Sequence, residues 1–499
     1  YAKGLPGVTD QRPALRLELI VDCQDGSQSR VASDASWKAD AGPVRLLGGL
    51  RHGGGDFGVE VYDARREQPG WNQAGFDDSA WRPAVEFASQ FNWRAFRFVL
   101  VTGLQRKPSH SDAVAELITT DLPRCGTFEC SDPVLNRLHE LVVHTFRCTT
   151  LGGIQVDCPH RERLGYGAEG QGGLPQAVYN FDAAAFYAKW ARDFQDGQDT
   201  DSGLVYYTAP FRIHSGGGPA WSGACIVYPW NVYLFYGDKR VLADGYPTMR
   251  RWLAWLDTQT TDGLLRPYGL PKMNIWQYLG DWASPRRPED TLPCNGHWTS
   301  DEDNRVFNDL HHYLQVTLTG RIAAILGHAD EARAYQEQAT ALRQAINRAY
   351  FDPQTARYTH GEQQQTYLAF PLLLDIVPAE HRERVLRNLV DDIVRKRDGH
   401  LDYGVLGGVY TLAELIRAGR SDLIYSMVTQ PTWPSYRQMI EQGATTLWEH
   451  WRAGDSSIHN SFLAIGGWFY SGLAGILPDP DSPGFRHVII RPQPVPGVT

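Results

Sequence analysis

The sequence has little that suits a protein to nucleic acid or to a lipid surface. Its 499 residues carry a formal net charge of −9, and no run is rich in lysine or arginine. Both partners require a positive surface, so neither is expected. No apolar run is long enough to span a bilayer. The first residues, YAKGLPGVT, lack the basic and apolar regions of a secretory signal. Cytoplasmic and exported locations both stay open.

Cysteine is scarce and scattered. The seven cysteines form neither a CxxC motif nor a Cys/His set with zinc spacing, so we expect free thiols, no metal site and no other cofactor. They are Cys23, Cys125, Cys130, Cys148, Cys158, Cys225 and Cys294. Aromatic residues are abundant, with 16 Trp and 23 Tyr. Flat rings suit the C–H faces of sugars, but many of these rings belong to a core, so the count supports carbohydrate binding only weakly.

The residue pattern changes along the chain from β-prone to helical and back to β-prone. At about 150 residues per domain, its length predicts two or three domains. Residues 1–108 alternate short β-prone runs with turn clusters, which predicts an all-β domain, most simply a sandwich. Residues 109–122 are expected to be a linker, and residues 123–477 a helical catalytic domain. Residues 478–499 return to a β pattern.

The helical region has the pattern of successive helix hairpins. Gly237, Gly327 and Gly419 each end one apolar-periodic run just before another begins. A first helix is predicted to open at Ser131, with that serine as its cap. Further helices are predicted at 176–195, 221–236, 239–257, 304–326, 329–349, 366–376, 379–396, 406–418, 421–428 and 457–474. No fixed sequence repeat is visible, so we predict a closed all-α (α/α)6 barrel rather than an open solenoid.

The C-terminal residues predict one strand, GFRHVIIRP at 484–492, after the helix-breaking DPDSP at 479–483. The residues after this strand offer it no partner. It therefore either joins the N-terminal sandwich or opens a C-terminal β-sandwich, of which this chain holds only the first piece.

The segment Asp157–Gln171, DCPHRERLGYGAEGQ, is the hardest part of the chain to explain as packing. Its proline and glycines argue against a continuous helix, so we expect a loop that folds three carboxylates toward one point. A salt-bridged surface turn is the ordinary alternative. Ordering several glycines beside clustered like charges disfavours that alternative. The loop has neither GxGxxG nor GxxxxGK[ST], so it is no phosphate cradle.

Three further segments are expected at the same end of the barrel. They are residues 276–282 with Asp281 and Trp282, residues 441–451 with Trp448, Glu449 and Trp451, and the pair His459 and Asn460. A glutamate between two indoles commonly just snorkels at a helix end. In a cavity, the indoles would instead desolvate Glu449 and raise its pKa, or offer a platform to a sugar.

Two carboxylates on opposite sides of an aromatic pocket are the equipment of glycoside hydrolysis. One protonates the leaving oxygen, and the other attacks the anomeric carbon or activates a water that does. Metal-assisted hydrolysis fits less well, because Asp157, Glu162 and Glu169 have no HxxH nearby, and a lone His160 is more often a hydrogen-bonding residue than a ligand.

Three ordered strings resemble those of bacterial inverting α-L-rhamnosidases of glycoside hydrolase family 78. They are DCPHRERLGY from Asp157 with Glu169 after it, GATTLWEHW from Gly443, and IHN from Ile458. Strings at 61–66, 95–99 and 484–492 resemble the sandwiches that flank the barrel in this family. The resemblance implies an (α/α)6-barrel hydrolase that releases terminal α-L-rhamnose from rhamnosides or rhamnose-containing glycans.

The same resemblance implies roles for individual residues. Glu162 would be the general acid and Glu449 the general base that activates water. The substrate-binding residues would be Asp157, Arg161, Glu169, Tyr166, Asp281, Trp282, Trp448 and His459. An inverting mechanism would place the two catalytic carboxyl groups roughly 6.5–9.5 Å apart. Glu169 and Tyr166 depart from the family's usual Asp and Trp, which bears on the glycan rather than on the acid–base pair.

Two other functions fit the same pattern. A polysaccharide lyase on this fold would abstract the C5 proton of a uronate, with Tyr166, His160 or His214 as its base. Arg286 or Arg287 would neutralise the uronate carboxylate. A catalytically silent carbohydrate-binding relative would keep the pocket without turnover. A lyase product absorbs in the ultraviolet and a hydrolase product does not, so absorbance separates the lyase from the hydrolase.

Overall fold

A computed structural model describes residues 117–211, 217–268, 278–285, 301–361, 363–453 and 456–499, with two residues of one turn and the backbone of six short strands nearer the N-terminus. The chain divides into two compact units. One comprises Tyr1–Phe98 and Arg212–His214, and the other Val99–Phe211 and Ser215–Thr499.

The N-terminal unit contributes three antiparallel strand pairs. These are β1 (Glu18–Asp22) with β2 (Gln28–Ala32), β4 (Val44–Leu47) with β5 (Val59–Tyr62), and β3 (Lys38–Ala39) with β6 (Arg82–Pro83). The strands agree with the β pattern of the sequence. Their assembly into a sandwich stays a prediction.

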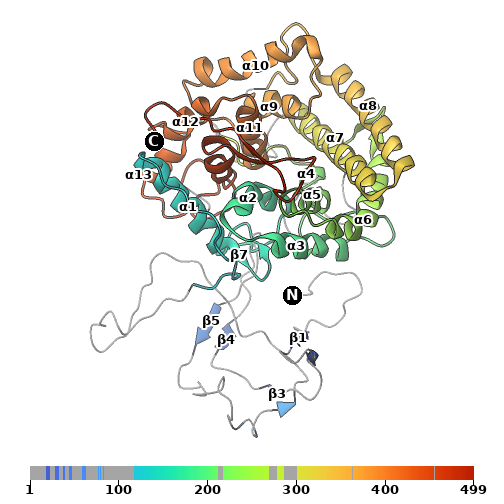
Figure 1. Ribbon diagram of the computed structural model, residues 1–499, viewed down its shortest axis with the longest axis vertical. Coiled ribbons are helices and arrows are strands. Elements are labelled where there is room, and N and C mark those ends of the chain that lie inside the picture. The colour runs from blue at the N-terminus through green and yellow to red at the C-terminus, as the bar shows by residue number, and fades with distance from the viewer. Residues whose placement is uncertain are drawn as a thin grey trace. The chain divides into compact units, whose positions relative to one another are not determined.

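The second unit is built of helices (Figure 1). In chain order they are α1 (Pro133–Thr149), α2 (Gly167–Asn180), α3 (Ala184–Asp196), α4 (Pro219–Ser222), α5 (Ala224–Tyr236), α6 (Arg240–Asp257), α7 (Asp301–Leu326), α8 (Ala329–Tyr350), α9 (Gln365–Leu373), α10 (Arg382–Asp391), α11 (Val405–Arg417), α12 (Ser421–Thr429), α13 (Tyr436–Glu441) and α14 (Ile465–Trp468). Two-residue strands form the pairs β7 (Thr150–Leu151) with β8 (Ile154–Gln155), and β9 (Thr260–Thr261) with β10 (Leu264–Leu265). None of the helices in the described ranges is long and apolar enough to cross a membrane.

The helices differ in how much of their surface is buried. α2 and α9 are buried around nearly their whole circumference, whereas α1, α3, α6 and α10 bury one face. A helix buried all round belongs in an interior, and an amphipathic one covers it. Figure 1 shows α1, α3, α6, α8, α10 and α12 toward the outside of this unit and α2, α5, α9 and α11 toward its centre. Chain neighbours such as α5 with α6 and α7 with α8 pack as hairpins.

The three glycines predicted to end helices are confirmed, and some predicted helix limits are corrected. Gly237, Gly327 and Gly419 all adopt left-handed backbone, with φ of 73°, 90° and 73°. The cap of α1 is Asp132 rather than Ser131, because its side chain accepts the N–H of Val134 at 2.8 Å. The predicted helix 176–195 is two helices, separated at residues 181–183. The predicted helix 457–474 begins only at residue 465, with a π-helical turn at 469–473, since the residues before it form turns.

The expected loop at 157–171 ends earlier than the sequence suggests, because α2 begins at Gly167. Its glycines serve close packing rather than a break in the helix. A Cβ on Gly167 would lie 2.0 Å from the carbonyl oxygen of Trp221, and one on Gly170 would lie 1.9 Å from the hydroxyl of Tyr228. Glycine therefore lets α2 approach α4 and α5 more closely than any other residue would.

The C-terminal strand has a partner that neither alternative from the sequence included, because that partner precedes the strand in the chain. β12 (Val488–Ile490) pairs antiparallel with β11 (Ile476–Pro478), which precedes it in the chain. The segment after β11 is fastened to the helical unit. Gly484 N donates to Leu234 O at 2.8 Å, and Gln493 Nε2 donates to Ile416 O at 2.7 Å.

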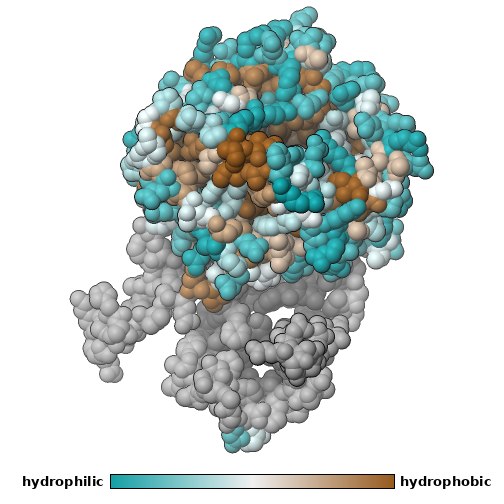
Figure 2. Space-filling model, viewed as in Figure 1, coloured by the Kyte–Doolittle hydropathy of each residue, from teal (hydrophilic) through white to brown (hydrophobic). Residues whose placement is uncertain are grey.

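The side chains of β12, Val488, Ile489 and Ile490, are apolar and exposed, with Ile490 63% accessible. Figure 2 shows hydrophobic atoms gathered where this dark-red C-terminal segment runs in Figure 1. A C-terminal sandwich stays a prediction. Five of the seven cysteines lie in the described part of the helical unit, and all five are free thiols as expected.

Candidate active site

The loop between β8 and α2 is closed at its base by its first aspartate. Asp157 N donates to Leu164 O at 3.0 Å, and Leu164 N donates to Asp157 Oδ1 at 2.8 Å. Arg163 turns the chain with a left-handed φ of 59°, and its N–H donates to Cys158 O at 3.2 Å. Residues 159–163 therefore lie on a short, hydrogen-bonded loop.

The third sequence motif lies directly against this loop. Asn460 N donates to Asp157 O at 3.2 Å, and Asn460 Nδ2 donates to Val156 O at 2.9 Å. His459 Nε2 lies 4.0 Å from Asp157 Oδ2, which also accepts the thiol of Cys158 at 2.9 Å. The turns at 456–464 that replace the predicted helix are what bring these residues together.

The two predicted catalytic glutamates face one arginine. Arg161 Nη2 lies 2.7 Å from Glu449 Oε2 and 3.5 Å from Glu162 Oε1. Tyr166 donates its hydroxyl to the other oxygen of Glu162 at 2.9 Å. The side chain of Glu449 is 5% exposed and that of Glu162 is 15% exposed. Arg161 of the segment at 157–171 thus joins Glu449 of the segment at 441–451 to the same loop as Glu162.

Glu449 is held as a carboxylate, contrary to the expectation that its surroundings would raise its pKa. Burial does oppose ionisation, but the neighbouring basic groups His459, His450 and Arg161 outweigh it and hold the pKa of Glu449 below its ordinary value, and of the three only Arg161 carries a permanent charge. Burial lowers the pKa of His459 itself to about 4, so this imidazole is neutral near pH 7. The guanidinium of Arg161 carries a positive charge at any physiological pH.

Asp157, Glu162, Glu169 and Glu449 together form an acidic cluster. The pKa values of two of its members, Asp157 and Glu169, are raised rather than lowered. Burial, with the nearby charge of Glu162, raises the pKa of Asp157 well above its ordinary value. Burial raises the pKa of Glu169, in the first turn of α2, to about 8, although a hydrogen bond with Trp221 opposes this. Glu169 Oε2 has no hydrogen-bond partner in the described parts of the chain. Near pH 7 the cluster thus contains an ionised Glu449 and a largely protonated Glu169.

The aromatic residues around the cluster have different surroundings. Trp448 is buried beside Glu449, and the ring of Trp282 lies 6.3 Å from that of His450 between centroids. Trp451 is stacked on Phe462 at 3.9 Å, and its indole N–H donates to a backbone carbonyl. Trp282 is therefore near Glu449 through His450, Trp448 is the chain neighbour of Glu449 and is packed into the core, and Trp451 belongs to the core.

Asp281 is placed differently from the other predicted site residues. It is 0% exposed, and both of its oxygens accept hydrogen bonds from the protein. The donors are Gly404 N at 2.7 Å, Gly407 N at 2.9 Å, Thr366 Oγ1 at 2.9 Å and Gln363 Nε2 at 3.0 Å. A carboxylate with four protein donors holds the backbone at the start of α11 and has little capacity left for a sugar hydroxyl.

Two residues of the site escaped the sequence reasoning. Trp221 on α4 hydrogen-bonds Glu169, and the thiol of Cys158 donates to Asp157. Nothing in the sequence separates Trp221 from fifteen other tryptophans, whereas Cys158 lies inside the motif itself. Of the residues considered for a lyase, Tyr166 and His160 lie on the loop just described. His214, Arg286 and Arg287 lie outside the described residues.

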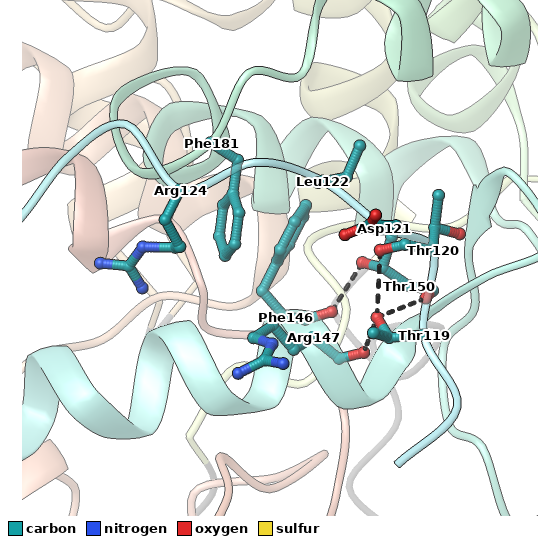
Figure 3. Close-up of a pocket in the computed structure, with 9 residues that line it drawn as sticks. All are labelled: Thr119, Thr120, Asp121, Leu122, Arg124, Phe146, Arg147, Thr150 and Phe181. Atoms are coloured by element: carbon teal, nitrogen blue, oxygen red, sulfur yellow. Dashed lines mark hydrogen bonds between the residues drawn. The ribbon is translucent and has the colours of Figure 1, made fainter.

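A separate small pocket of about 170 Å³ shares no residue with the acidic cluster (Figure 3). It lies between the strap at residues 119–124 and the last turns of α1. Thr119 Oγ1 donates to Arg147 O at 2.8 Å and to Thr150 O at 3.1 Å, and the guanidinium of Arg124 lies 5.1 Å from the ring centre of Phe181. These contacts fasten the strap to the helical unit.

Comparison with known proteins gives consistent matches. Residues 123–473 match the bacterial alpha-L-rhamnosidase 6 hairpin glycosidase domain, and residues 5–96 match the alpha-L-rhamnosidase N-terminal domain. An alpha-L-rhamnosidase of Streptomyces avermitilis is 28% identical over 97% of this chain and 54% of its own length. One from Alteromonas sp. is 27% identical over 82% of this chain and 44% of its own length. The chain thus spans about half the length of these relatives.

Solved structures agree with this assignment. The alpha-L-rhamnosidase of Dictyoglumus thermophilum superposes with a TM-score of 0.78 at 25% identity, covering 97% of this chain and 63% of that one. The Streptomyces avermitilis alpha-L-rhamnosidase, solved in complex with L-rhamnose, gives 0.77 at 25% identity, covering 97% and 54%. With its helical unit matched from residue 123 to residue 473, the chain belongs to the bacterial α-L-rhamnosidase family.

Proposed function

We propose that this chain carries the active site of an inverting glycoside hydrolase that releases terminal α-L-rhamnose from rhamnosides or rhamnose-containing glycans. The observation that carries the proposal is the pair Glu162 and Glu449, brought from distant parts of the chain to within 3.5 Å and 2.7 Å of the same atom, Arg161 Nη2. The relative solved with L-rhamnose supports the choice of sugar. The inner and outer sets of helices support a closed (α/α)6 barrel as the scaffold.

In the proposed reaction, protonated Glu162 donates its proton to the glycosidic oxygen as the bond to the anomeric carbon breaks. Glu449, ionised beside Arg161, removes a proton from a water molecule on the opposite face of the sugar. The water oxygen bonds to the anomeric carbon, so the configuration inverts. Tyr166 donates to Glu162 Oε2 at 2.9 Å and so orients the carboxyl group, whose Oε1 atom faces Arg161.

We infer that the sugar is bound by the residues around this pair. Trp282 and Trp448 offer apolar faces, and Arg161, Asp157 and His459 offer polar groups. A protonated Glu169 supplies a hydrogen-bond donor where an ionised acid would only accept. Asp281 is left out of this set, since its oxygens are occupied by four protein donors.

The test is incubation with p-nitrophenyl α-L-rhamnoside while NMR follows the anomer of the released sugar. Initial release of the β-anomer supports substrate and inversion together, and initial release of the α-anomer rules out inversion. A product absorbing in the ultraviolet from a rhamnosyl-uronate polymer would favour the lyase. Binding of rhamnose without any turnover, or full turnover by Glu162→Gln, would contradict the hydrolase.

A further inference from the structure

We propose that Arg161 is the residue that keeps the base Glu449 ionised, and that it thereby sets the acidic limit of activity. This task is separate from holding sugar hydroxyls, which the family resemblance assigns to the same residue. The inference rests on the function proposed above, because it concerns the base of that reaction.

Arg161 is the permanent positive charge that lies in direct hydrogen-bond contact with Glu449. Its Nη2 atom lies 2.7 Å from Glu449 Oε2, the distance of a charge-assisted hydrogen bond. The Glu449 side chain is 5% exposed, so water does little to solvate its charge. A carboxylate buried to this degree takes up a proton unless a cation or several donors compensate for the lost water.

The other groups that face Glu449 compensate less well. His450 Nε2 is 3.8 Å from Glu449 Oε1, which is beyond hydrogen-bond distance. His459 is neutral near pH 7, because burial lowers its pKa to about 4 and its Nδ1 is hydrogen-bonded to Ser461 Oγ at 2.7 Å.

The acids of the cluster work against ionisation of Glu449. Glu162 shares the guanidinium of Arg161, and the charge of Glu449 acts on Glu169. Glu169 adds little repulsion near pH 7, since burial raises its pKa to about 8. Asp157 faces the same region through His459, 4.0 Å away. Arg161 is thus the permanently charged group in direct contact with a base that lies among three other acids.

Arg161 is also held in position from its own loop. The sulfur of Cys158 accepts the N–H of Glu162, the residue that follows Arg161, at 3.4 Å. The closure of the loop through Asp157 and Leu164 fixes the backbone on both sides. The guanidinium is therefore in position before any sugar binds. This is required of a group that keeps Glu449 ionised in the free enzyme.

The experiment compares Arg161→Met with Arg161→Lys in pH profiles of kcat and kcat/KM on p-nitrophenyl α-L-rhamnoside. Removing an opposite charge at this distance is expected to move the acidic limb upward by about one pH unit or more in the Met variant. The Lys variant keeps the charge, so its limb stays near that of the wild type while KM rises. If KM rises in both variants and neither limb moves, Arg161 only holds the sugar and the proposal is overturned.

The matched control is Arg397→Met, which breaks another arginine pair with a buried acid. Arg397 Nη2 lies 2.6 Å from Asp402 Oδ2, and neither residue belongs to the acidic cluster. We expect a lower melting temperature and an unmoved acidic limb. A limb that moves equally in this control would mean that loss of stability, rather than the local charge, explains the result.

A second readout needs no turnover. Infrared difference spectra recorded against pH follow protonation of Glu449, with Glu449→Gln identifying the band. We expect the protonated band at higher pH in Arg161→Met than in the wild type, and an unchanged band position overturns the proposal. If the wild type hydrolyses no rhamnoside, the proposed function fails, while these spectra still decide the role of Arg161.

Discussion

Two buried acids of this protein, Asp281 and Glu449, have similar sequence neighbours but different partners in the structure. Asp281 precedes a tryptophan and Glu449 follows one, and each is almost fully buried. Asp281 accepts four hydrogen bonds, two of them from backbone N–H groups at the start of α11. Glu449 instead forms an ion pair with an arginine that also contacts a second acid, Glu162. Burial alone therefore does not mark a functional carboxylate, but its partners do.

Asp281 also differs from Glu169, another buried acid of the candidate site, in how fully its oxygens are surrounded. A Cβ on Gly407 would lie 1.9 Å from Asp281 Oδ2, so the chain there is built around the carboxylate. Glu169, by contrast, has one oxygen with no partner among the described residues. A carboxyl group whose oxygens all have hydrogen-bond donors stabilises the fold, whereas one with an unpaired oxygen is available for a ligand or a proton.

The largest expected contrast is in activity. Glu449→Gln should lower kcat by about 10²–10⁴-fold, because an amide cannot accept the proton of the attacking water. Its melting temperature should change little, since the substitution also removes a buried charge. Rhamnoside hydrolysis and thermal unfolding measure the two effects. Retention of more than about a tenth of the activity would contradict the role of general base.

The pH dependence of stability tests the state of Glu169. Its pKa is about 8 in the folded protein against an ordinary 4.5, so between these values the folded chain holds a proton that the unfolded chain releases. The free energy of unfolding should therefore fall as pH rises from 4.5 to 8, with a slope approaching about 1.4 kcal/mol per pH unit.

In Glu169→Gln this contribution to the slope should disappear, which thermal unfolding across the pH range would show. Asp157 contributes in the same direction, because its pKa is also raised, so some slope should remain. Identical slopes in the variant and the wild type would mean that Glu169 is ionised in the folded protein.

Asp281→Asn should affect stability first. An asparagine turns an NH2 group toward at least one backbone N–H, so a hydrogen bond to a charged group is lost and a repulsion replaces it. We expect the free energy of unfolding to fall by about 1.5–3 kcal/mol, measured by denaturant unfolding. The folded variant should keep far more activity than Glu449→Gln. An equal loss of kcat at unchanged stability would return Asp281 to the substrate-binding residues.

The smallest expected effect belongs to Thr366→Val, which removes one of the four donors to Asp281 and keeps the shape of the side chain. The loss should be about 1 kcal/mol, because three donors remain. The same denaturant titration measures it. A loss as large as that of Asp281→Asn would show that the hydroxyl, rather than the backbone N–H groups, carries the interaction.

Much of the candidate site was predictable because its residues occur in short, ordered strings. Asp157, Glu162 and Glu449 stand in such strings, and the hairpin glycines fixed most helix limits to within a few residues. Other predictions failed for physical reasons. Gly167 and Gly170 looked like helix breakers, yet they lie within a helix whose neighbours leave no room for a Cβ. β12 pairs with a strand of three residues, too short to stand out from the end of the preceding helix.

By itself, the sequence determined the family, the helical class of the larger unit and the identity of the acids, because these depend on local order and on residue type. Only the tertiary structure decided which acids meet. The approach of Arg161 to Glu449 joins segments far apart in the chain, and the direction of each pKa shift depends on burial and on neighbours that no local pattern specifies. The same long-range contacts separate Asp281, whose oxygens hold backbone, from the acids available for chemistry.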